Sequence, residues 1–221
     1  MKTGRLLCAT MVGLLAWIVA AAAQQEFPPP QGKGRVVVVA SGQSGPGHYT
    51  AVTQQIAQLG YDAVLFDSNP MEGTRGAALR AAIQQAQQMP HALPGKVVLI
   101  GFSLGGAISL GFGTMMGNEV AGAILWYPAT SEIRDIPGLV SRVRVPVLMF
   151  AGEQDSYRGC CLIGTARTIA STAAAAGKPF ELVTYPNARH DFVYGGDNYD
   201  AQVYQDAMRR TAAKLKEFFA N

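Results

Sequence analysis

Apolar runs of four to seven residues alternate with segments of helical periodicity along most of this chain. The runs are rich in β-branched residues and are flanked by glycine, proline or polar positions, which predicts buried strands. These predicted strands cover residues 35–40, 63–66, 97–100, 120–126, 145–150 and 180–185. The segments between and after them are apolar at helical spacing or rich in Ala and Gln, and predict helices at 50–59, 74–89, 104–116, 165–176 and 201–219.

The alternation predicts an α/β fold with a mostly parallel sheet and helices on both faces. The chain has 221 residues, which suits one domain over 35–221 without an inserted cap domain. Residues 24–34 are rich in proline and glycine and predict a surface linker in front of that domain. Because ligands bind at the carboxyl ends of parallel strands, the loops that follow the predicted strands are the places to look for a site.

The first 23 residues have a different pattern. Lys2 and Arg5 precede an apolar stretch from Met11 to Ala20, and small residues follow up to Ala23. This order predicts a secretory signal peptide cleaved after Ala23, and therefore an exported protein, periplasmic or secreted. The alternative is an uncleaved membrane anchor, which the small residues at the cut and the proline-rich segment after it disfavour.

Charge excludes several partner classes. The formal net charge is +3, and it falls to +1 once Lys2 and Arg5 are removed with the leader. A nearly neutral chain does not favour nucleic acid or an anionic surface. The rest of the chain has no second apolar run long enough for a membrane span, so no stable membrane insertion is expected after cleavage. The sequence gives no indication of oligomeric state.

The strand predicted at 97–100 leads directly into Gly101-Phe102-Ser103-Leu104-Gly105-Gly106, and a helix is predicted after it. Strand, G-x-S-x-G and helix together are typical of a nucleophile elbow. Small residues two before and two after the serine allow the strained turn, which exposes its hydroxyl at a helix N-terminus. The alternative is a glycine-rich structural turn with an incidental serine. The residues that follow the other predicted strands decide between these two interpretations.

Asp155 and His190 each follow a later predicted strand, so the chain order is serine, acid, histidine. This is the order of a Ser–Asp–His triad in α/β-hydrolases, with His190 as general base and Asp155 orienting it. Glu153 is the alternative acid on the same loop, whereas Asp191 is a sequence neighbour of the base and is expected to be structural.

The loop after the first predicted strand, Ser41 to His48, is where a second oxyanion donor is needed. We expect the backbone N–H groups of Leu104 and Gln43 to form the oxyanion hole. Four further residues are candidates for the pocket, with core or turn positions as their alternatives: Gly42, His48, Trp126 and Tyr127.

The remaining histidine and cysteines predict no metal site. His91 lies between a predicted helix and strand and is expected at the surface. Cys160 and Cys161 are adjacent, and no cluster of His or Cys with metal-ligand spacing accompanies them. They are open to two interpretations, a vicinal disulfide or buried thiols. No cofactor is expected.

Three segments resemble the dienelactone hydrolase family of α/β-hydrolases: Gly-Phe-Ser-Leu-Gly-Gly at 101–106, Ala-Gly-Glu-Gln-Asp at 151–155 and Tyr-Pro-Asn-Ala-Arg-His-Asp-Phe at 185–192. The resemblance implies the roles of nucleophile, acid and base for Ser103, Asp155 and His190. Two departures stand out. The enzymes that give the family its name carry cysteine where this chain has Ser103, and a glutamate in the early loop where this chain has Ser41-Gly42-Gln43.

These observations predict an exported serine carboxylesterase that cleaves small or short-acyl esters through an acyl-serine intermediate. One alternative keeps the triad and changes the bond, to a thioester, an amide or a lactone of the dienelactone type. Another, from a different class, is a non-catalytic binding protein on a hydrolase scaffold.

Overall fold

The computed structural model describes residues 24–220, and the predicted signal peptide lies outside them. Seven strands form one sheet in the order β1-β3-β2-β4-β5-β6-β7, in which β1 is antiparallel to β3 and the other neighbours are parallel. The strands are β1 (Gln24–Phe27), β2 (Gly34–Ala40), β3 (Asp62–Phe66), β4 (Ala92–Phe102), β5 (Val120–Trp126), β6 (Val147–Gly152) and β7 (Phe180–Tyr185).

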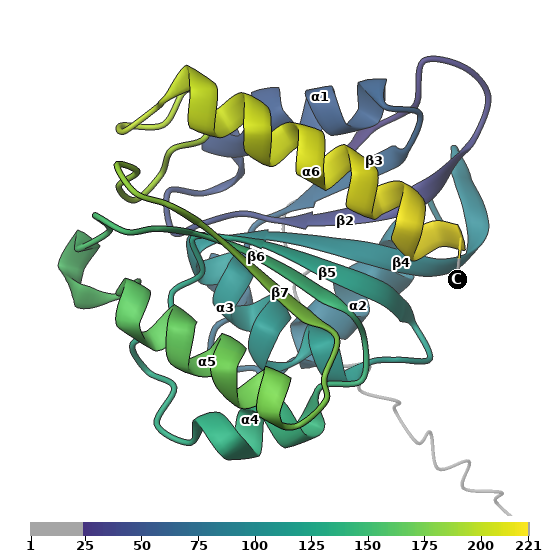
Figure 1. Ribbon diagram of the computed structural model, residues 1–221. Coiled ribbons are helices and arrows are strands. Elements are labelled where there is room, and N and C mark those ends of the chain that lie inside the picture. The colour runs from purple at the N-terminus through teal and green to yellow at the C-terminus, as the bar shows by residue number, and fades with distance from the viewer. Residues whose placement is uncertain (1–23, 221) are drawn as a thin grey trace, which may run out of the picture.

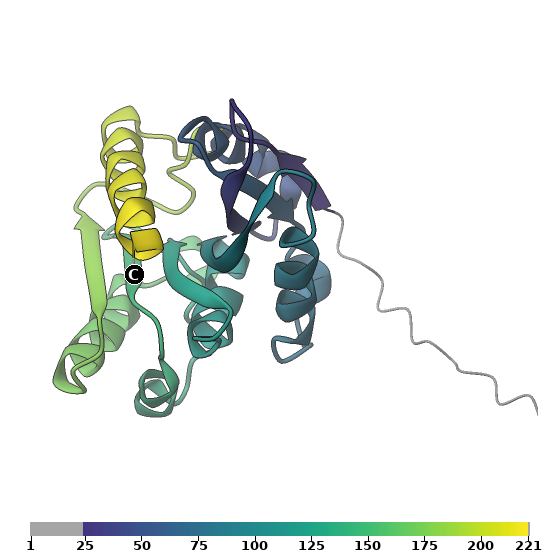
Figure 2. The ribbon, with the colours of Figure 1, turned by 90° about the vertical axis from the view of Figure 1, so that its right-hand side faces the viewer.

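Helices cover both faces of the sheet (Figures 1 and 2). One face carries α1 (Thr50–Gln58) and α6 (Ala201–Ala220). The other carries α2 (Ala77–Ala86), α3 (Ser103–Gly111), α4 (Ile136–Arg142) and α5 (Ile163–Ala175). Four short 3-10 helices complete the described elements: η1 (Pro46–Tyr49), η2 (Asn69–Met71), η3 (Gly113–Met115) and η4 (Tyr157–Gly159).

The four valines of β2 explain why its sequence is apolar without interruption. Val36 and Val38 face the core on the side of α2 to α5, whereas Val37 and Val39 face the core under α1 and α6. A central parallel strand is buried on both faces, so both sets of alternating side chains have to be apolar. The fold is thus the single-domain α/β architecture that the pattern predicts.

The predicted strands and helices correspond to observed elements, with boundaries that differ by a few residues. The prediction of a linker over 24–34 is wrong at its start, because Gln24–Phe27 forms β1 at the edge of the sheet. A four-residue edge strand has only one neighbour and leaves half of its residues exposed, so it lacks the apolar run that marks the central strands. Helix α4 was not expected either; Asp135 caps it by accepting a hydrogen bond from Gly138 N at 2.8 Å.

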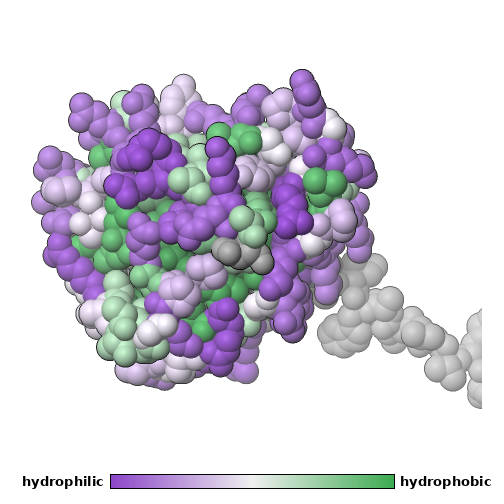
Figure 3. Space-filling view, turned by 45° about the vertical axis from the view of Figure 1, so that its right-hand side comes forward, coloured by the Kyte–Doolittle hydropathy of each residue, from purple (hydrophilic) through white to green (hydrophobic). Residues whose placement is uncertain are grey.

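The parallel strands end on two sides of the sheet, which we call the carboxyl edge and the amino edge, and the two have different surroundings. At the carboxyl ends of β2, β4, β6 and β7 lie the loops that hold the predicted site residues. The amino-terminal ends lie on the other side, which Figure 3 brings forward and where hydrophobic residues are visible among hydrophilic ones. Within residues 24–220, no helix combines the length and apolarity that crossing a membrane requires.

Candidate active site

Ser103 stands at the sharp turn between β4 and α3, with a positive φ of 47°. Its neighbours explain the two glycines of the motif. A Cβ atom at Gly101 would collide with the backbone of Gly105, and one at Gly105 would collide with the carbonyl oxygen of Ala40 at the end of β2. Only glycine fits at these two positions, which allows the backbone segments to approach closely and the turn to place the Ser103 hydroxyl toward the loops at the carboxyl edge.

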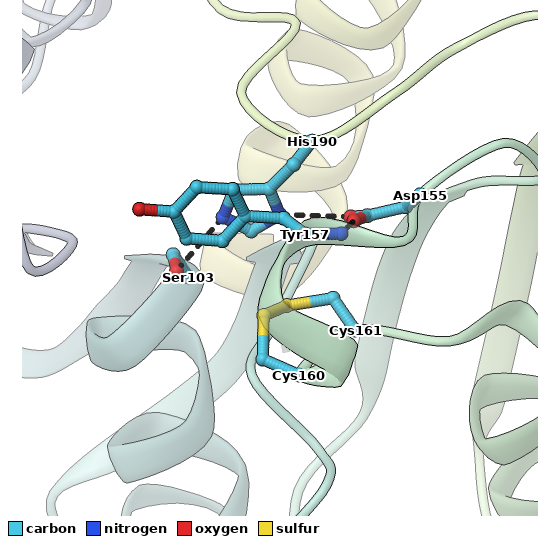
Figure 4. Close-up of a disulfide and its surroundings, with 6 residues drawn as sticks. All are labelled: Ser103, Asp155, Tyr157, Cys160, Cys161 and His190. Carbon is cyan, nitrogen blue, oxygen red and sulfur yellow. Dashed lines mark hydrogen bonds and ion pairs between the residues drawn. A yellow bond between two sulfur atoms is a disulfide. The ribbon is translucent and has the colours of Figure 1, made fainter.

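A chain of two hydrogen bonds joins the three side chains that the sequence singles out (Figure 4). His190 Nε2 lies 3.1 Å from Ser103 Oγ, and His190 Nδ1 lies 2.8 Å from Asp155 Oδ2. All three side chains are buried. The alternative acid, Glu153, instead accepts a hydrogen bond from Arg167 at 2.6 Å. The structure thus brings Asp155, and not Glu153, to the histidine.

Aromatic rings hold the imidazole of His190 on two sides. Tyr157 stacks on it with ring centroids 4.7 Å apart and an angle of 5° between the planes. Tyr127 meets it edge-on at 4.9 Å. The backbone N–H of Tyr157 also donates to Asp155 Oδ1 at 3.1 Å, so each carboxylate oxygen accepts one hydrogen bond. These contacts restrict rotation of the His190 imidazole away from the position in which it bridges Ser103 and Asp155.

Asp191 follows the histidine with a positive φ of 63°, and its carboxylate is held from three directions. His48 Nε2 lies 2.9 Å from Oδ2, Tyr127 donates its hydroxyl at 3.2 Å, and the N–H of Asp197 donates at 3.2 Å. Burial raises the pKa of the Tyr127 hydroxyl, which keeps it a neutral donor. Asp191, for which a structural role was expected, and His48 therefore belong to one hydrogen-bond network beside His190.

The loop after β2 lies against the serine. A Cβ atom at Gly42 would be 3.3 Å from Ser103 Cβ and would collide with the hydroxyl of Tyr49. Ser41 fixes the start of this loop, because its carbonyl oxygen accepts from Gly105 N at 3.0 Å and its Oγ accepts from Ser68 N at 3.2 Å. Burial, followed by the charge of Asp191, raises the pKa of Tyr49, which lies under the same loop.

The two predicted oxyanion donors flank the serine from different segments. Leu104 is the second residue of α3, where a backbone N–H has no acceptor within the helix. Gln43 lines the cavity in front of Ser103, and its carbonyl oxygen accepts from Asn69 Nδ2 at 3.3 Å.

A small cavity of about 50 Å³, open to solvent, lies in front of the serine. It is lined by Gln43, Ser44, Tyr49, Ser103, Tyr157, His190, Asp191, Asp197 and Asn198.

Four residues predicted for the pocket do not line this cavity. Trp126 and Tyr127 are buried in the aromatic core under α6, Gly42 is covered by Tyr49, and His48 lies behind Asp191. Besides Ser103, His190, Asp191 and the loop residues Gln43 and Ser44, four residues that were not predicted line it: Tyr49, Tyr157, Asp197 and Asn198. Of these four, only Tyr157 carries a sequence signal, as an aromatic residue two positions after Asp155.

Cys160 and Cys161 form a vicinal disulfide, which decides between the two interpretations of the pair. Their sulfur atoms and a ring nitrogen of His190 lie within 4.8 Å of one another, the one group of possible metal ligands of this kind among the described residues. In the disulfide the two sulfurs are bonded to each other and offer no thiolate to a metal ion. His190 is in addition hydrogen-bonded on both ring nitrogens, so its arrangement favours proton transfer.

Comparison with known proteins gives one family and many structures of the same fold. The model of the dienelactone hydrolase family matches residues 65–219. No curated protein matches the chain in sequence. A candidate dienelactone hydrolase from Klebsiella pneumoniae has a TM-score of 0.71 at 19% identity, covering 87% of this chain and 96% of its own.

Two other structures are nearly as similar. A thermophilic esterase from Thermogutta terrifontis with bound propionate has a TM-score of 0.67 at 19% identity, covering 88% of both chains. A dienelactone hydrolase-like promiscuous phosphotriesterase from metagenomic libraries has a TM-score of 0.70 at 18% identity, covering 90% of this chain and 99% of its own. At such low identity these structures establish the shared fold.

Proposed function

Since the chain belongs to the dienelactone hydrolase family and is a hydrolase that acts on ester bonds, we propose that it is a serine carboxylesterase for small or short-acyl esters. In this proposal Ser103 is the nucleophile, His190 the base and Asp155 the acid. One observation carries the proposal. The hydroxyl, imidazole and carboxylate form a buried hydrogen-bonded chain that ends at a small cavity.

Each member of this chain has one role. His190 Nε2 accepts the hydroxyl proton while Ser103 Oγ attacks the ester carbonyl, because a serine hydroxyl is a poor nucleophile without a base. Asp155 accepts the hydrogen bond of Nδ1, which selects the productive tautomer and stabilises the imidazolium. The imidazolium returns the proton to the leaving alcohol. Water then attacks the acyl-serine through the same base and releases the carboxylic acid.

The oxyanion of the tetrahedral intermediate accepts hydrogen bonds from the backbone N–H groups of Leu104 and Gln43. Two features support these positions. The amide of Leu104 lies in the first turn of α3, where the helix dipole favours negative charge. Gln43 lines the cavity in front of the serine, and the carbonyl oxygen of Ser41 accepts a hydrogen bond from Gly105 N, which holds the loop after β2 against α3.

The size and the lining of the cavity support a small acyl group. A volume of about 50 Å³ leaves room for a two- to four-carbon acyl chain only if part of it stays at the open rim. The esterase from Thermogutta terrifontis, which shares the fold, has been seen with propionate and with butyrate bound. Ser103 in place of the family's cysteine, and Gln43 in a loop without a carboxylate, argue against a dienelactone as substrate.

Export is part of the proposal. The basic, apolar and small residues of 1–23 support a cleaved signal peptide. The disulfide between Cys160 and Cys161 is also in keeping with an oxidising compartment, since cytosolic reductants keep most thiols reduced. Cell fractionation of the full-length chain tests it: mature protein beginning at Gln24 outside the inner membrane supports export, and full-length protein in the cytosol contradicts it.

The catalytic proposal is tested with p-nitrophenyl esters of increasing acyl length, using the mature chain and its Ser103→Ala variant. Loss of the nucleophile should lower kcat by about 10³-fold or more, leaving only the help of the oxyanion hole. Ser171→Ala, the same substitution at an exposed position of α5, serves as the matched control and should retain full activity.

We expect activity to peak with acetate to butyrate esters. A preference for long-chain esters would contradict the short-acyl proposal. Equal activity in the mature chain and in Ser103→Ala would contradict the nucleophile and favour a binding protein on a hydrolase scaffold.

A further inference from the structure

The loop from Asp155 to Cys161 surrounds the base rather than only supplying its acid. Asp155 accepts the hydrogen bond of His190 Nδ1, Tyr157 stacks on one face of the ring, and the disulfide sulfurs lie within 4.8 Å of a ring nitrogen. In Figure 4 the Tyr157 ring overlies the imidazole and the disulfide lies beside the His190–Asp155 pair. A loop of seven residues thus approaches the His190 side chain in three ways: through a carboxylate, an aromatic ring and a disulfide.

Backbone hydrogen bonds at Cys160 fix the far end of this loop, where the disulfide lies, to the segment that follows β5. The carbonyl oxygen of Cys160 accepts hydrogen bonds from Thr130 N at 2.8 Å and Ser131 N at 2.9 Å. The same segment is joined to the nucleophile, because Ala129 N donates to the carbonyl oxygen of Ser103 at 3.0 Å. Cys161 is buried, and the loop is therefore tied at one end to the acid and at the other to the backbone beside the serine.

The middle of the loop has a backbone that needs such support. Arg158 has a φ of 46°, in the left-handed region that is unfavourable for a non-glycine residue. Cys160 N donates to the carbonyl oxygen of Tyr157 at 2.9 Å, which closes a tight turn over Arg158 and Gly159. This turn sets where the Tyr157 ring lies. The ring stacks on the imidazole of His190, the Arg158 guanidinium lies over it with Cζ 5.2 Å from the ring centroid, and the residue is partly open to solvent.

We propose that Tyr157 and the Cys160–Cys161 disulfide form a positioning clamp on the base, which makes the enzyme sensitive to reduction by dithiols. The inference rests on the proposed function, because it concerns the base of that reaction. With the disulfide intact, the tight turn presses the Tyr157 ring against the imidazole and holds Nε2 toward Ser103. Without it, the turn relaxes and the imidazole samples positions out of line with the hydroxyl, which lowers kcat more than it raises KM.

The reduction step balances with a dithiol as the reductant. One thiolate of the dithiol attacks a sulfur of the pair, forms a mixed disulfide and releases the other cysteine as a thiolate. The second thiol of the reductant then attacks its own mixed disulfide and leaves as a cyclic disulfide. Two electrons and two protons pass to Cys160 and Cys161, and Cys160 is the accessible end because it is partly exposed.

The first experiment compares the mature enzyme before reduction, after reduction and after reoxidation. Dithiothreitol is removed anaerobically by gel filtration before the assay, because thiols cleave p-nitrophenyl esters themselves. We expect two titratable thiols to appear, kcat for p-nitrophenyl acetate to fall about ten-fold with KM changed less than two-fold, and both values to return on reoxidation.

The Cys160→Ser/Cys161→Ser variant is the matched control for the chemistry. It should have the kcat of the reduced enzyme, and dithiothreitol should not change it. Thermal unfolding of every form shows whether the chain is folded at the assay temperature. If the double variant does not fold, the reversible change in the wild-type enzyme still decides.

The second experiment separates the ring from its hydroxyl. Tyr157→Phe keeps the stacking on His190 and should retain at least half of kcat, whereas Tyr157→Ala should match the reduced enzyme and lose its sensitivity to dithiothreitol. Ser156→Ala, at the exposed neighbouring position, should behave as the wild-type enzyme in every respect.

An active esterase whose kcat is the same in the oxidised, reduced and Tyr157→Ala forms would overturn the clamp and leave the proposed function intact. The proposed function fails separately, through undiminished activity in Ser103→Ala. The clamp is supported if reduced wild type, Tyr157→Ala and reduced Tyr157→Ala all have the same lowered kcat. If reduction lowers the kcat of Tyr157→Ala further, the disulfide acts without Tyr157, and the clamp is contradicted.

Discussion

Both edges of the sheet carry carboxylates with little solvent exposure, but the hydrogen-bond surroundings differ. Asp155 and Asp62 are buried, and Asp191 is partly buried. At the carboxyl edge, Asp155 accepts hydrogen bonds from His190 and Tyr157, and Asp191 accepts them from His48 and Tyr127. At the amino edge, Asp62 begins β3 fully buried, and no N–H or hydroxyl group of the described residues donates to its oxygens.

The pKa of Asp62 reflects this difference. Burial raises it to about 6, and the neighbouring Glu26 carboxyl adds to the increase, whereas His91 acts in the opposite direction. A buried carboxylate is stable as an anion only where donors replace the water it has lost. Donors replace this water at the carboxyl edge, whereas the amino edge holds a carboxylate that is costly to ionise.

Asp155→Asn should produce the largest effect on the site edge. The amide keeps the shape of the side chain but no longer accepts from His190 Nδ1 in the productive tautomer, so kcat should fall by about 10³- to 10⁴-fold. Glu153→Gln, two residues earlier and paired with Arg167, is the matched control and should change kcat less than three-fold. Steady-state kinetics with p-nitrophenyl acetate measures both; a larger loss in Glu153→Gln would reverse the assignment of the acid.

The two histidines outside the triad allow the edges to be compared directly. His48 holds Asp191 behind the base, whereas His91 holds Glu26 on β1 with Nδ1 3.0 Å from the carboxylate. His48→Ala should lower kcat by about ten-fold, because a hydrogen bond to a charged group contributes about 1.5–3 kcal/mol to the position of the loop. His91→Ala should leave kcat unchanged. Equal kcat values in the two variants would show that Asp191 does not position the base.

Asp62→Asn should change stability without changing kcat. The pKa of Asp62 is about 6 in the folded protein against an ordinary value of 3.8, so the folded state binds its proton more tightly than the unfolded state does. Wild-type stability therefore falls as the pH rises from about 4 to about 6, and the penalty remains above that range. The variant should be more stable at pH 7, by up to about 3 kcal/mol, and equally stable below pH 4.

Urea unfolding at pH 4, 5, 6 and 7 measures this difference. Glu72→Gln, which removes one exposed carboxylate directly after η2, should show no comparable dependence on pH. A variant that is less stable than the wild type at pH 7 would show that the ionised Asp62 carboxylate is favourable.

The sequence was sufficient for most of the fold and for the three central side chains. Uninterrupted apolar runs such as Val36 to Val39 mark central parallel strands, because only a strand buried on both faces needs them. The elbow could be predicted because its glycines are forced by backbone contacts that any chain with this turn has to make. Asp155 and His190 followed from their places after the strands.

The rest of the site depends on distances that no local pattern encodes. Tyr157 stacks on a histidine 33 residues later in the chain, and His48 meets Asp191 across 143 residues. Trp126 looked like a candidate for the pocket because it ends a strand at the right edge, but the packing of α6 makes that position core. The strand at Gln24–Phe27 was missed because its partner β3, and not its own composition, stabilises it.

The backbone at the site has a consequence for attempts to engineer this protein. Ser103, Tyr127, Arg158 and Asp191 have φ values of 47°, 38°, 46° and 63°, and apart from Arg75 they are the described non-glycine residues with positive φ. A screen that selects for heat tolerance alone would favour glycine or asparagine at such positions, since either relieves the strain. Laboratory evolution for thermal stability alone would then lower kcat first. Selection for both thermal stability and kcat in every round avoids this loss.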